Sequence, residues 1–240
     1  MATPAFTLAG VDGCKGGWIA VVADGDLKRV QIQKVTAVAD LLARVPTLRI
    51  IAIDIPIGLP SRDCPLRGCD QEARRLLGPS AQSRVFFAPQ RFLLGIRDYR
   101  VAVERCNTEL GLGNALSIYA FAILPRIEEV DSLVRRIGQE VAREVHPELS
   151  FWSMNDHQTV ESKHSQAGLD KRQVLLDHFF GPKTVVQCNR DRWGTHAKLN
   201  DLYDAFAALW SAKRILEGHS CKLPVKPEKD AEGLLMEINY

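Results

Sequence analysis

The stretch 8-LAGVDGCKGGWIAVVADGD-26 contains two apolar runs separated by a glycine-rich turn. The first run ends at Asp12, and the glycines after it free the backbone to reverse direction. This pattern predicts an antiparallel pair of strands over 6–11 and 17–23. Asp12 would then lie at the rim of a buried strand, where an unpaired carboxylate is costly. It either caps the turn by bonding its own backbone or binds a cation.

The segments that follow extend this pair into a larger sheet. Residues 27–35 predict a weaker third strand of an antiparallel meander, and residues 37–44 carry apolar positions at helical spacing. The most continuous apolar run of the chain covers 49–60, and its first half predicts a strand buried on both faces. That strand ends in Asp54. Two buried strands therefore each end in an aspartate followed by turn residues.

The remainder of the chain is mainly helical by its periodicity. We expect helices over 70–77, 97–110, 117–124 and 127–141, followed by a short strand within 143–155 and a polar loop over 156–172. Two further helices, over 174–180 and 199–217, and a final edge strand over 233–240 complete the chain. The prediction is an α/β protein with a mixed five-stranded sheet, three strands of it an antiparallel meander and the others parallel, flanked by helices. Residues 1–240 are expected to form a single domain, with a helical arginine-rich insertion at about 61–140.

Composition narrows the classes of protein to consider. The 240 residues are 46% hydrophobic with a net charge of +2, and no apolar run reaches the roughly 18 residues of a membrane span. With no signal-peptide pattern at the start, we expect a cytoplasmic protein without a membrane partner. The six scattered cysteines predict reduced thiols, and Cys64 and Cys69 lack the second pair typical of structural zinc. The apolar C-terminal edge is consistent with a homodimer or with an internal edge strand.

Positive charge is concentrated in one segment. Residues 60–105 contain nine arginines, no lysine and five acidic residues. Arginine without lysine favours bidentate contacts to phosphate or carboxylate. We take Arg62, Arg84 and Arg91 as candidate contacts to a nucleic-acid backbone. An ordinary solvated helical face is the alternative interpretation.

A second acidic feature lies on the last predicted helix. Asp201 and Asp204 are three residues apart and share one face of the helix. Ala205 and Ala208 keep that face small enough to approach a sheet closely. Alternatively, Asn200 or Asp201 caps the helix, and Asp204 interacts with the first turn.

The four aspartates together describe a candidate metal site. Two strand-end acids, Asp12 and Asp54, and a helix face with Asp201 and Asp204 provide the carboxylate oxygens that hard divalent ions take. A hard ion such as Mg²⁺, which takes carboxylate oxygens and keeps some of its waters, is the expected occupant of such a site.

Further candidates lie near the predicted strand at 143–155 and in the first turn. Glu144, His146 and Glu148 occupy alternate positions, which a continuing strand would place on one face unless Pro147 breaks that register. Glu148 is a candidate ligand or base, whereas His146 before a proline is either a turn histidine or a contact to substrate. Lys15 in the glycine turn could approach a phosphate, although its surroundings lack P-loop spacing.

Four motifs carry a resemblance to a known family. The order of predicted elements resembles the ribonuclease H-like superfamily. More narrowly, the chain resembles the bacterial and archaeal domain-of-unknown-function family of predicted RNase H-like nucleases, through GVDGCKGGW at 10–18, DIPIGLP at 54–60, EVHPELSFW at 144–152 and DLYDAFAALWSAKR at 201–214.

The resemblance implies that Asp12, Asp54, Asp201 and Asp204 converge on one or two Mg²⁺ or Mn²⁺ ions. The pair on the helix resembles that of RuvC-type Holliday-junction resolvases. Some relatives have a further aspartate where this chain has Asn200, and this departure removes a charge from the ligand set.

Two functions from different classes follow from these features. The leading hypothesis is a metal-dependent nuclease that acts on DNA or RNA, with the four aspartates and Glu148 as its catalytic residues. The alternative is a nucleic-acid or nucleotide-binding protein of the same fold without hydrolytic activity. A relation to actin-like and sugar-kinase enzymes would require a second copy of the domain and a glycine-rich adenosine loop, neither of which the sequence contains.

Overall fold

The computed structural model describes residues 5–111, 116–192 and 194–240. These residues divide into two compact units. Unit 1 holds the chain through Asp54, then Glu140–Cys221 and Asn239–Tyr240, and unit 2 holds Ile55–Gln139 and Lys222–Ile238.

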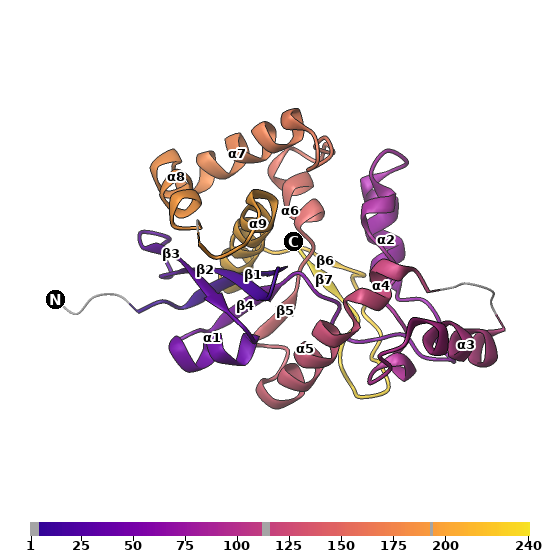
Figure 1. Ribbon diagram of the computed structural model, residues 1–240. Coiled ribbons are helices and arrows are strands. Elements are labelled where there is room, and N and C mark those ends of the chain that lie inside the picture. The colour runs from indigo at the N-terminus through magenta and orange to yellow at the C-terminus, as the bar shows by residue number, and fades with distance from the viewer. Residues whose placement is uncertain (1–4, 112–115, 193) are drawn as a thin grey trace. The chain divides into compact units, whose positions relative to one another are not determined.

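Unit 1 is built on one mixed five-stranded sheet with the strand order β3-β2-β1-β4-β5 (Figure 1). β1, β2 and β3 pair antiparallel, and β4 and β5 continue the sheet in parallel from β1. The strands are β1 Leu8–Cys14, β2 Gly17–Ala23, β3 Val30–Val35, β4 Ile50–Ile53 and β5 Ala142–Glu144. The predicted α/β class, the antiparallel meander and the parallel strands are confirmed.

Helices cover both faces of this sheet. The helix α9, Leu199–Leu216, packs across β1, β2 and β4, and α6, Pro147–Met154, packs against α9. In Figure 1, α9 lies above the sheet and α1, Val38–Arg44, lies below it. All four residues of β4 are buried, as its continuous apolar sequence predicts.

A glycine on β1 allows α9 to lie directly on the sheet. A Cβ atom built at Gly10 would come within 2.0 Å of the Leu209 backbone nitrogen and 2.2 Å of the Ala205 carbonyl oxygen. Ala205 and Ala208 are fully buried on the facing helix. The small side chains predicted to permit a close approach therefore do so, and they bring the acidic residues of α9 to the rim of β1.

The segment 143–155 differs from its prediction. Instead of continuing as a strand, the chain leaves β5 at Glu144 and begins α6 at Pro147. Proline fits the first turn of a helix because its missing N–H would have no intrahelical partner there. Glu144 and Glu148 consequently belong to different elements and do not share a strand face.

Other boundaries also differ. The predicted loop 156–172 ends earlier, because α7 spans Gln166–Phe180 and Ser165 caps it by accepting a hydrogen bond from the Gly168 N–H at 3.1 Å. An additional helix, α8, covers Pro182–Asp191. The predicted edge strand 233–240 is reduced to β7, Ile238–Asn239, in the chain that the structure describes.

Unit 2 contains most of the arginine-rich segment and is mainly helical. Its elements are α2 Gly68–Leu77, the 3-10 turns η1 Gln82–Arg84 and η2 Arg91–Leu93, α3 Tyr99–Leu110, α4 Ile118–Ala122, α5 Leu124–Ile137 and the short strand β6 Lys222–Leu223. Buried ion pairs hold it together, among them Arg67 with Asp70 at 2.5 Å. Within the described ranges, none of the helices is both long and apolar enough to cross a membrane.

Candidate functional site

Three predicted acids come together at one rim of the sheet in unit 1. β1 and β4 are parallel neighbours in which Val11 lies opposite Ile53, so Asp12 and Asp54 occupy the next position on each chain. Asp204 reaches the same place from the second turn of α9, which packs on both strands. We call these three residues the carboxylate cluster. Their convergence follows from parallel strand register and from the close contact of α9 at Gly10.

The cluster is unfavourable for three negative charges. Burial, followed by the charges of Asp204 and Asp54, raises the pKa of Asp12 well above its ordinary value. Burial and the charge of Asp204 raise the pKa of Asp54 to about 7, and burial also raises the pKa of Asp204. Asp204 is 1% exposed, while Asp12 and Asp54 remain partly exposed. A positive charge placed here would therefore stabilise the ionised carboxylates.

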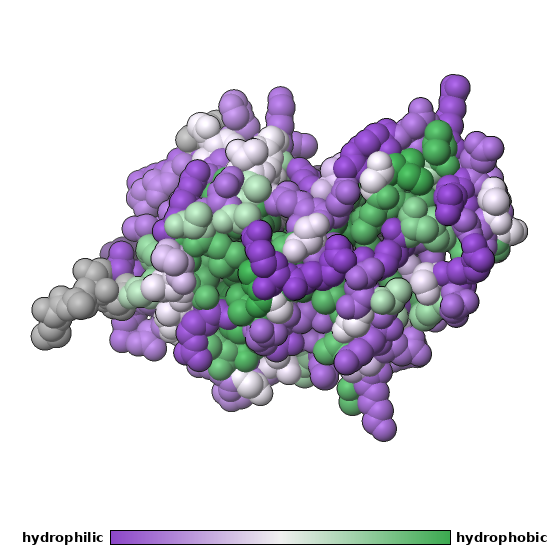
Figure 2. All heavy atoms as spheres, turned by 90° about the horizontal axis from the view of Figure 1, so that it is seen from below, coloured by the Kyte–Doolittle hydropathy of each residue, from purple (hydrophilic) through white to green (hydrophobic). Residues whose placement is uncertain are grey.

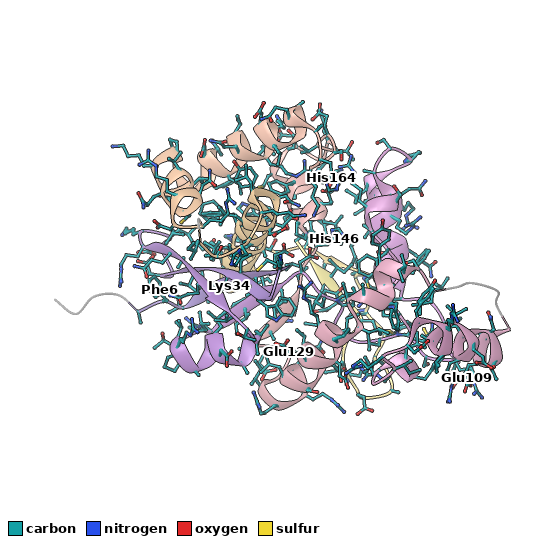
Figure 3. All side chains as sticks on the ribbon, viewed as in Figure 1. Phe6, Lys34, Glu109, Glu129, His146 and His164 are labelled. Atoms are coloured by element: carbon teal, nitrogen blue, oxygen red, sulfur yellow. The ribbon has the colours of Figure 1, made fainter. Side chains whose placement is uncertain are left out.

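One such charge is supplied by the chain itself. The ammonium of Lys163 lies 2.5 Å from Asp204 Oδ2 and is part-buried. Although burial disfavours its charged form, the charges of Asp204, Asp12 and Asp54 raise the pKa of Lys163 above its ordinary value. Lys163 lies in the segment between α6 and α7, next to His164, which Figure 3 labels. Lys163 is thus the counter-ion of the carboxylate cluster.

The other oxygen of Asp204 lacks a partner. Asp204 Oδ1 is buried and accepts no hydrogen bond from any group that the structure describes. A buried carboxylate oxygen without a donor is costly, and such an atom is a candidate ligand for a cation. The donor set of three carboxylates is of the type that Mg²⁺ and Mn²⁺ take.

The carboxylate cluster is not arranged as a set of metal ligands. In the described ranges 5–111, 116–192 and 194–240, no three His, Cys, Asp or Glu side chains are grouped as metal ligands. Two of the four predicted ligands have other partners: Asp204 Oδ2 pairs with Lys163, and Asp201 Oδ2 accepts a hydrogen bond from the Lys198 N–H at 2.8 Å. The chemistry of the donors fits a divalent ion, and two of the predicted ligands have protein partners.

Asp201 contributes to the cap of α9 from the third helical position, whereas the N-cap residue is Lys198 and not Asn200 or Asp201. The side chain of Asp201 satisfies the N–H of Lys198. Its charge still contributes to the raised pKa of Asp12. Asn200 precedes it in the first turn of α9.

Glu148 lies beside the cluster and is paired with a buried arginine. Glu148 Oε1 is 2.6 Å from Nη2 of Arg172, a residue of α7 that is 0% exposed. The charge of Glu148 adds to the raised pKa of both Asp54 and Asp204. Arg172 also donates to the carbonyl oxygen of Glu161 at 2.6 Å, two residues before Lys163. Arg172 therefore links Glu148 to the backbone of the segment that carries the counter-ion.

The predicted substrate contacts in unit 1 lie in two places. His146, labelled in Figure 3, is the N-cap of α6. Its Nδ1 accepts a hydrogen bond from the Glu148 N–H at 3.3 Å. Lys15 is exposed in the turn between β1 and β2, and its carbonyl oxygen accepts a hydrogen bond from Lys34 Nζ at 2.9 Å.

The predicted arginine contacts all lie in unit 2. Arg91 pairs with Asp131 at 2.8 Å and also with Asp230, and Arg62 pairs with Glu109. Arg84 lines an apolar cavity of about 590 Å³. The carboxylate partners of Arg91 and Arg62 belong to the same unit.

Sequence reasoning missed Lys163 and Arg172 as parts of the site. Lys163 lies 41 residues from Asp204 in a polar segment without periodicity, and Arg172 was placed in the same predicted loop. A signal existed in Ser165, a favoured N-cap residue that could have marked the start of α7 before Arg172. No local pattern marks Lys163.

The raised pKa of Asp54 predicts how stability depends on pH. The pKa of Asp54 is about 7 in the folded protein, above its ordinary value of 3.8. Between these two values, the folded protein binds a proton that the unfolded chain has released. This contribution to stability is complete below pH 3.8 and is lost as the pH rises through about 7. In EDTA, we expect the melting temperature to fall by about 5 °C between pH 6 and pH 8.

Thermal melts of Asp54→Asn in the same buffers isolate this contribution. The variant should lose much of the decrease between pH 6 and pH 8, because its amide does not titrate. Parallel pH profiles of the two proteins would contradict the assignment.

Most of the chain matches one known protein family. A family model described as Protein of unknown function (DUF429) matches residues 10–229. This match includes every member of the carboxylate cluster as well as Lys163, Arg172 and Glu148. No curated protein and no solved structure shows a significant match.

Proposed function

The chain belongs to the family described as Protein of unknown function (DUF429), and we propose that it is a divalent-metal-dependent nuclease. The observation that carries the proposal is the convergence of Asp12, Asp54 and Asp204 from two parallel strands and one helix. Mutual repulsion among these carboxylates and the unpartnered Asp204 Oδ1 favour a cation. The reaction would be hydrolysis of a phosphodiester bond in DNA or RNA.

The residues of unit 1 have distinct roles in this proposal. A bound Mg²⁺ or Mn²⁺ would supply positive charge to a phosphoryl oxygen and lower the pKa of an attacking water. Asp12 and Asp54 would hold the ion with their partly exposed carboxylates, and Asp204 would contribute Oδ1. Asp201 would hold the first turn of α9, and with it Asp204, in register with the sheet.

Glu148 has a positioning role here. Its ion pair with Arg172 and the bond from Arg172 to the Glu161 carbonyl oxygen tie α6 and α7 to the segment that carries Lys163. His146 contributes by capping α6, because its Nδ1 accepts the Glu148 N–H. These contacts fix the positions of the charged side chains of Glu148, Arg172 and Lys163 around the carboxylate cluster.

The order of the sheet supports the finer relationship with the RNase H-like superfamily. An antiparallel meander that continues into parallel β4 and β5 is the arrangement that the resemblance implies. Asp12 in β1, Asp54 directly after β4 and Asp204 on α9 are the acids that support this relationship. We therefore propose that unit 1 is an RNase H-like domain and that unit 2 contains its arginine-rich insertion.

A nuclease assay tests the proposed function directly. Purified protein is incubated with Mg²⁺, Mn²⁺ or EDTA and with labelled single-stranded, duplex, hybrid and branched nucleic acids. Metal-dependent cleavage of at least one substrate is expected. If every substrate remains intact across the range of metal concentrations, the proposed hydrolysis is wrong.

A second candidate function is nucleic-acid binding without hydrolysis, and a cavity in unit 2 favours it. The cavity of about 590 Å³ is lined by Phe86, Phe87 and Tyr119, and among the residues that the structure describes its lining includes two arginines but no acidic side chain. Phe86, Phe87 and Tyr119 are 37%, 40% and 80% exposed, and hydrophobic surface is visible in the region of α2, α3 and α4 in Figure 2. Exposed aromatic rings beside arginines are suited to stacked bases and phosphates.

Removal of one of these rings should weaken binding to single strands. The Arg74 guanidinium lies 4.8 Å from the centre of the Phe87 ring, so Phe87 orders both a stacking surface and a positive charge. Phe87→Ala is expected to raise the Kd for a single-stranded oligonucleotide about tenfold, since one stacked base contributes about 1–3 kcal/mol. Fluorescence anisotropy without metal measures this.

The matched control is Val101→Ala. Val101 is 51% exposed on α3 and does not line the cavity. Its variant should bind as the wild-type protein does. Equal affinities for the Phe87 and Val101 variants would exclude the cavity as a site for bases.

A further inference from the structure

We infer that Lys163 and a divalent cation are alternative counter-ions of the carboxylate cluster, so that metal binding displaces the Lys163 ammonium from Asp204. The inference rests on the metal site of the proposed function. It adds a residue outside the predicted ligands that sets the affinity of the site for metal. The metal-free protein would be held in its ion-paired form by Lys163.

The two partners of the ion pair differ in their freedom to move. Asp204 is 1% exposed and belongs to a helix that packs on β1, so its carboxylate is fixed. The side chain of Lys163 is 34% exposed, and its ammonium is carried on a flexible stem of four carbons. The ammonium can therefore turn toward solvent while the carboxylate stays in place.

The backbone at Lys163 is held in position by neighbouring residues. Arg172 donates to the Glu161 carbonyl oxygen at 2.6 Å. Gly168 of α7 packs so closely on this segment that an added Cβ would lie 2.1 Å from the Ser162 carbonyl oxygen. The ammonium is thus presented to the cluster by an anchored segment, and its displacement requires only rotation of the side chain.

Competition follows from the positions of the charges. The ammonium occupies Asp204 Oδ2 at 2.5 Å and leaves Oδ1 of the same carboxylate without a partner. A metal ion bound to the same carboxylate would be close to the ammonium, and the two positive charges would repel each other. Either the Lys163 ammonium or a divalent metal ion can compensate the negative charge of the three carboxylates. The metal ion compensates more of this charge because it carries two positive charges.

The first test uses the wild-type protein and the reactivity of the lysine amine. An amine-acylating reagent is applied with and without Mg²⁺, and modification of Lys163 and Lys183 is quantified by peptide mass spectrometry. We expect Mg²⁺ to increase acylation of Lys163 several-fold, because the displaced amine faces solvent. Lys183, exposed on α8, should not change. Unchanged or lower reactivity of Lys163 would overturn the inference.

The second test measures metal affinity by titration calorimetry. Lys163→Met should bind Mg²⁺ at least tenfold more tightly than the wild-type protein, whereas Lys163→Arg, which keeps the charge, should resemble it. Lys183→Met is the control. In EDTA, Lys163→Met should melt below the wild-type protein, and saturating Mg²⁺ should restore most of the difference. Equal or weaker binding by Lys163→Met contradicts the inference.

The outcomes separate this inference from the proposed function. Exchange of Lys163 for Mg²⁺ without cleavage of any substrate would support the inference and contradict the nuclease. Cleavage with metal affinity independent of Lys163 would support the nuclease and overturn the inference. Absence of Mg²⁺ binding in both wild-type protein and Lys163→Met would overturn both.

Discussion

The Asp12→Asn substitution is expected to lower the rate of metal-dependent cleavage by a factor of about 1000 or more, because it removes one proposed ligand of the metal ion. The same variant should melt at a higher temperature than the wild-type protein in EDTA at pH 8. Burial and the charges of Asp204 and Asp54 raise the pKa of Asp12, so its ionised form destabilises the folded state. A neutral amide removes that repulsion.

Single-turnover cleavage and calorimetric melts measure the two effects of Asp12→Asn. The matched control is Asp26→Asn, because the Asp26 side chain is 73% exposed and pairs only at the surface with Lys28 at 3.2 Å. That variant should retain both the rate and the melting temperature of the wild-type protein. Cleavage that survives Asp12→Asn would remove Asp12 from the catalytic set.

The Gly10→Ala variant is expected to lower the free energy of unfolding by about 3 kcal/mol or more. Its Cβ would lie 2.0 Å from the Leu209 nitrogen and 2.2 Å from the Ala205 carbonyl oxygen, both of which are backbone atoms of α9. A helix backbone cannot yield as a flexible side chain can. The helix must move away from β1, and Asp204 would move with it.

Thermal unfolding of Gly10→Ala should begin on the order of 10 °C below that of the wild-type protein. Gly25→Ala is the matched control, because its nearest non-neighbouring atom to an added Cβ is Thr7 Oγ1 at 3.6 Å, an ordinary contact. Its melting temperature should change little. Wild-type stability of Gly10→Ala would mean that α9 does not lie directly on β1.

The acids at the strand ends and the small face of α9 illustrate what local sequence can reveal. Asp12 and Asp54 are recognisable because each ends an apolar run, and such runs record burial along a single strand. The close approach of α9 is likewise predictable from the small residues Ala205 and Ala208. Strand burial and helix periodicity are properties of neighbouring residues, so they can be read without knowledge of the rest of the fold.

Other sequence expectations failed where two local signals competed. The alternation of Glu144, His146 and Glu148 suggested a strand, but Pro147 begins a helix with His146 as its cap. The ion pair of Glu148 was also not predictable, because its partner is distant in the sequence. Glu148 pairs with Arg172 across 24 residues, so its partner could not be inferred from its neighbours.

The sequence by itself determined the strands, the aspartates that end the apolar runs of β1 and β4, and the small face of α9, because each is encoded by the burial pattern of one element. Only the tertiary structure decided which of those acids meet and what neutralises them. It assigns Asp201 to the cap of α9 and Lys163 to Asp204. Such pairings depend on distances between residues far apart in the chain, and no periodicity records those distances.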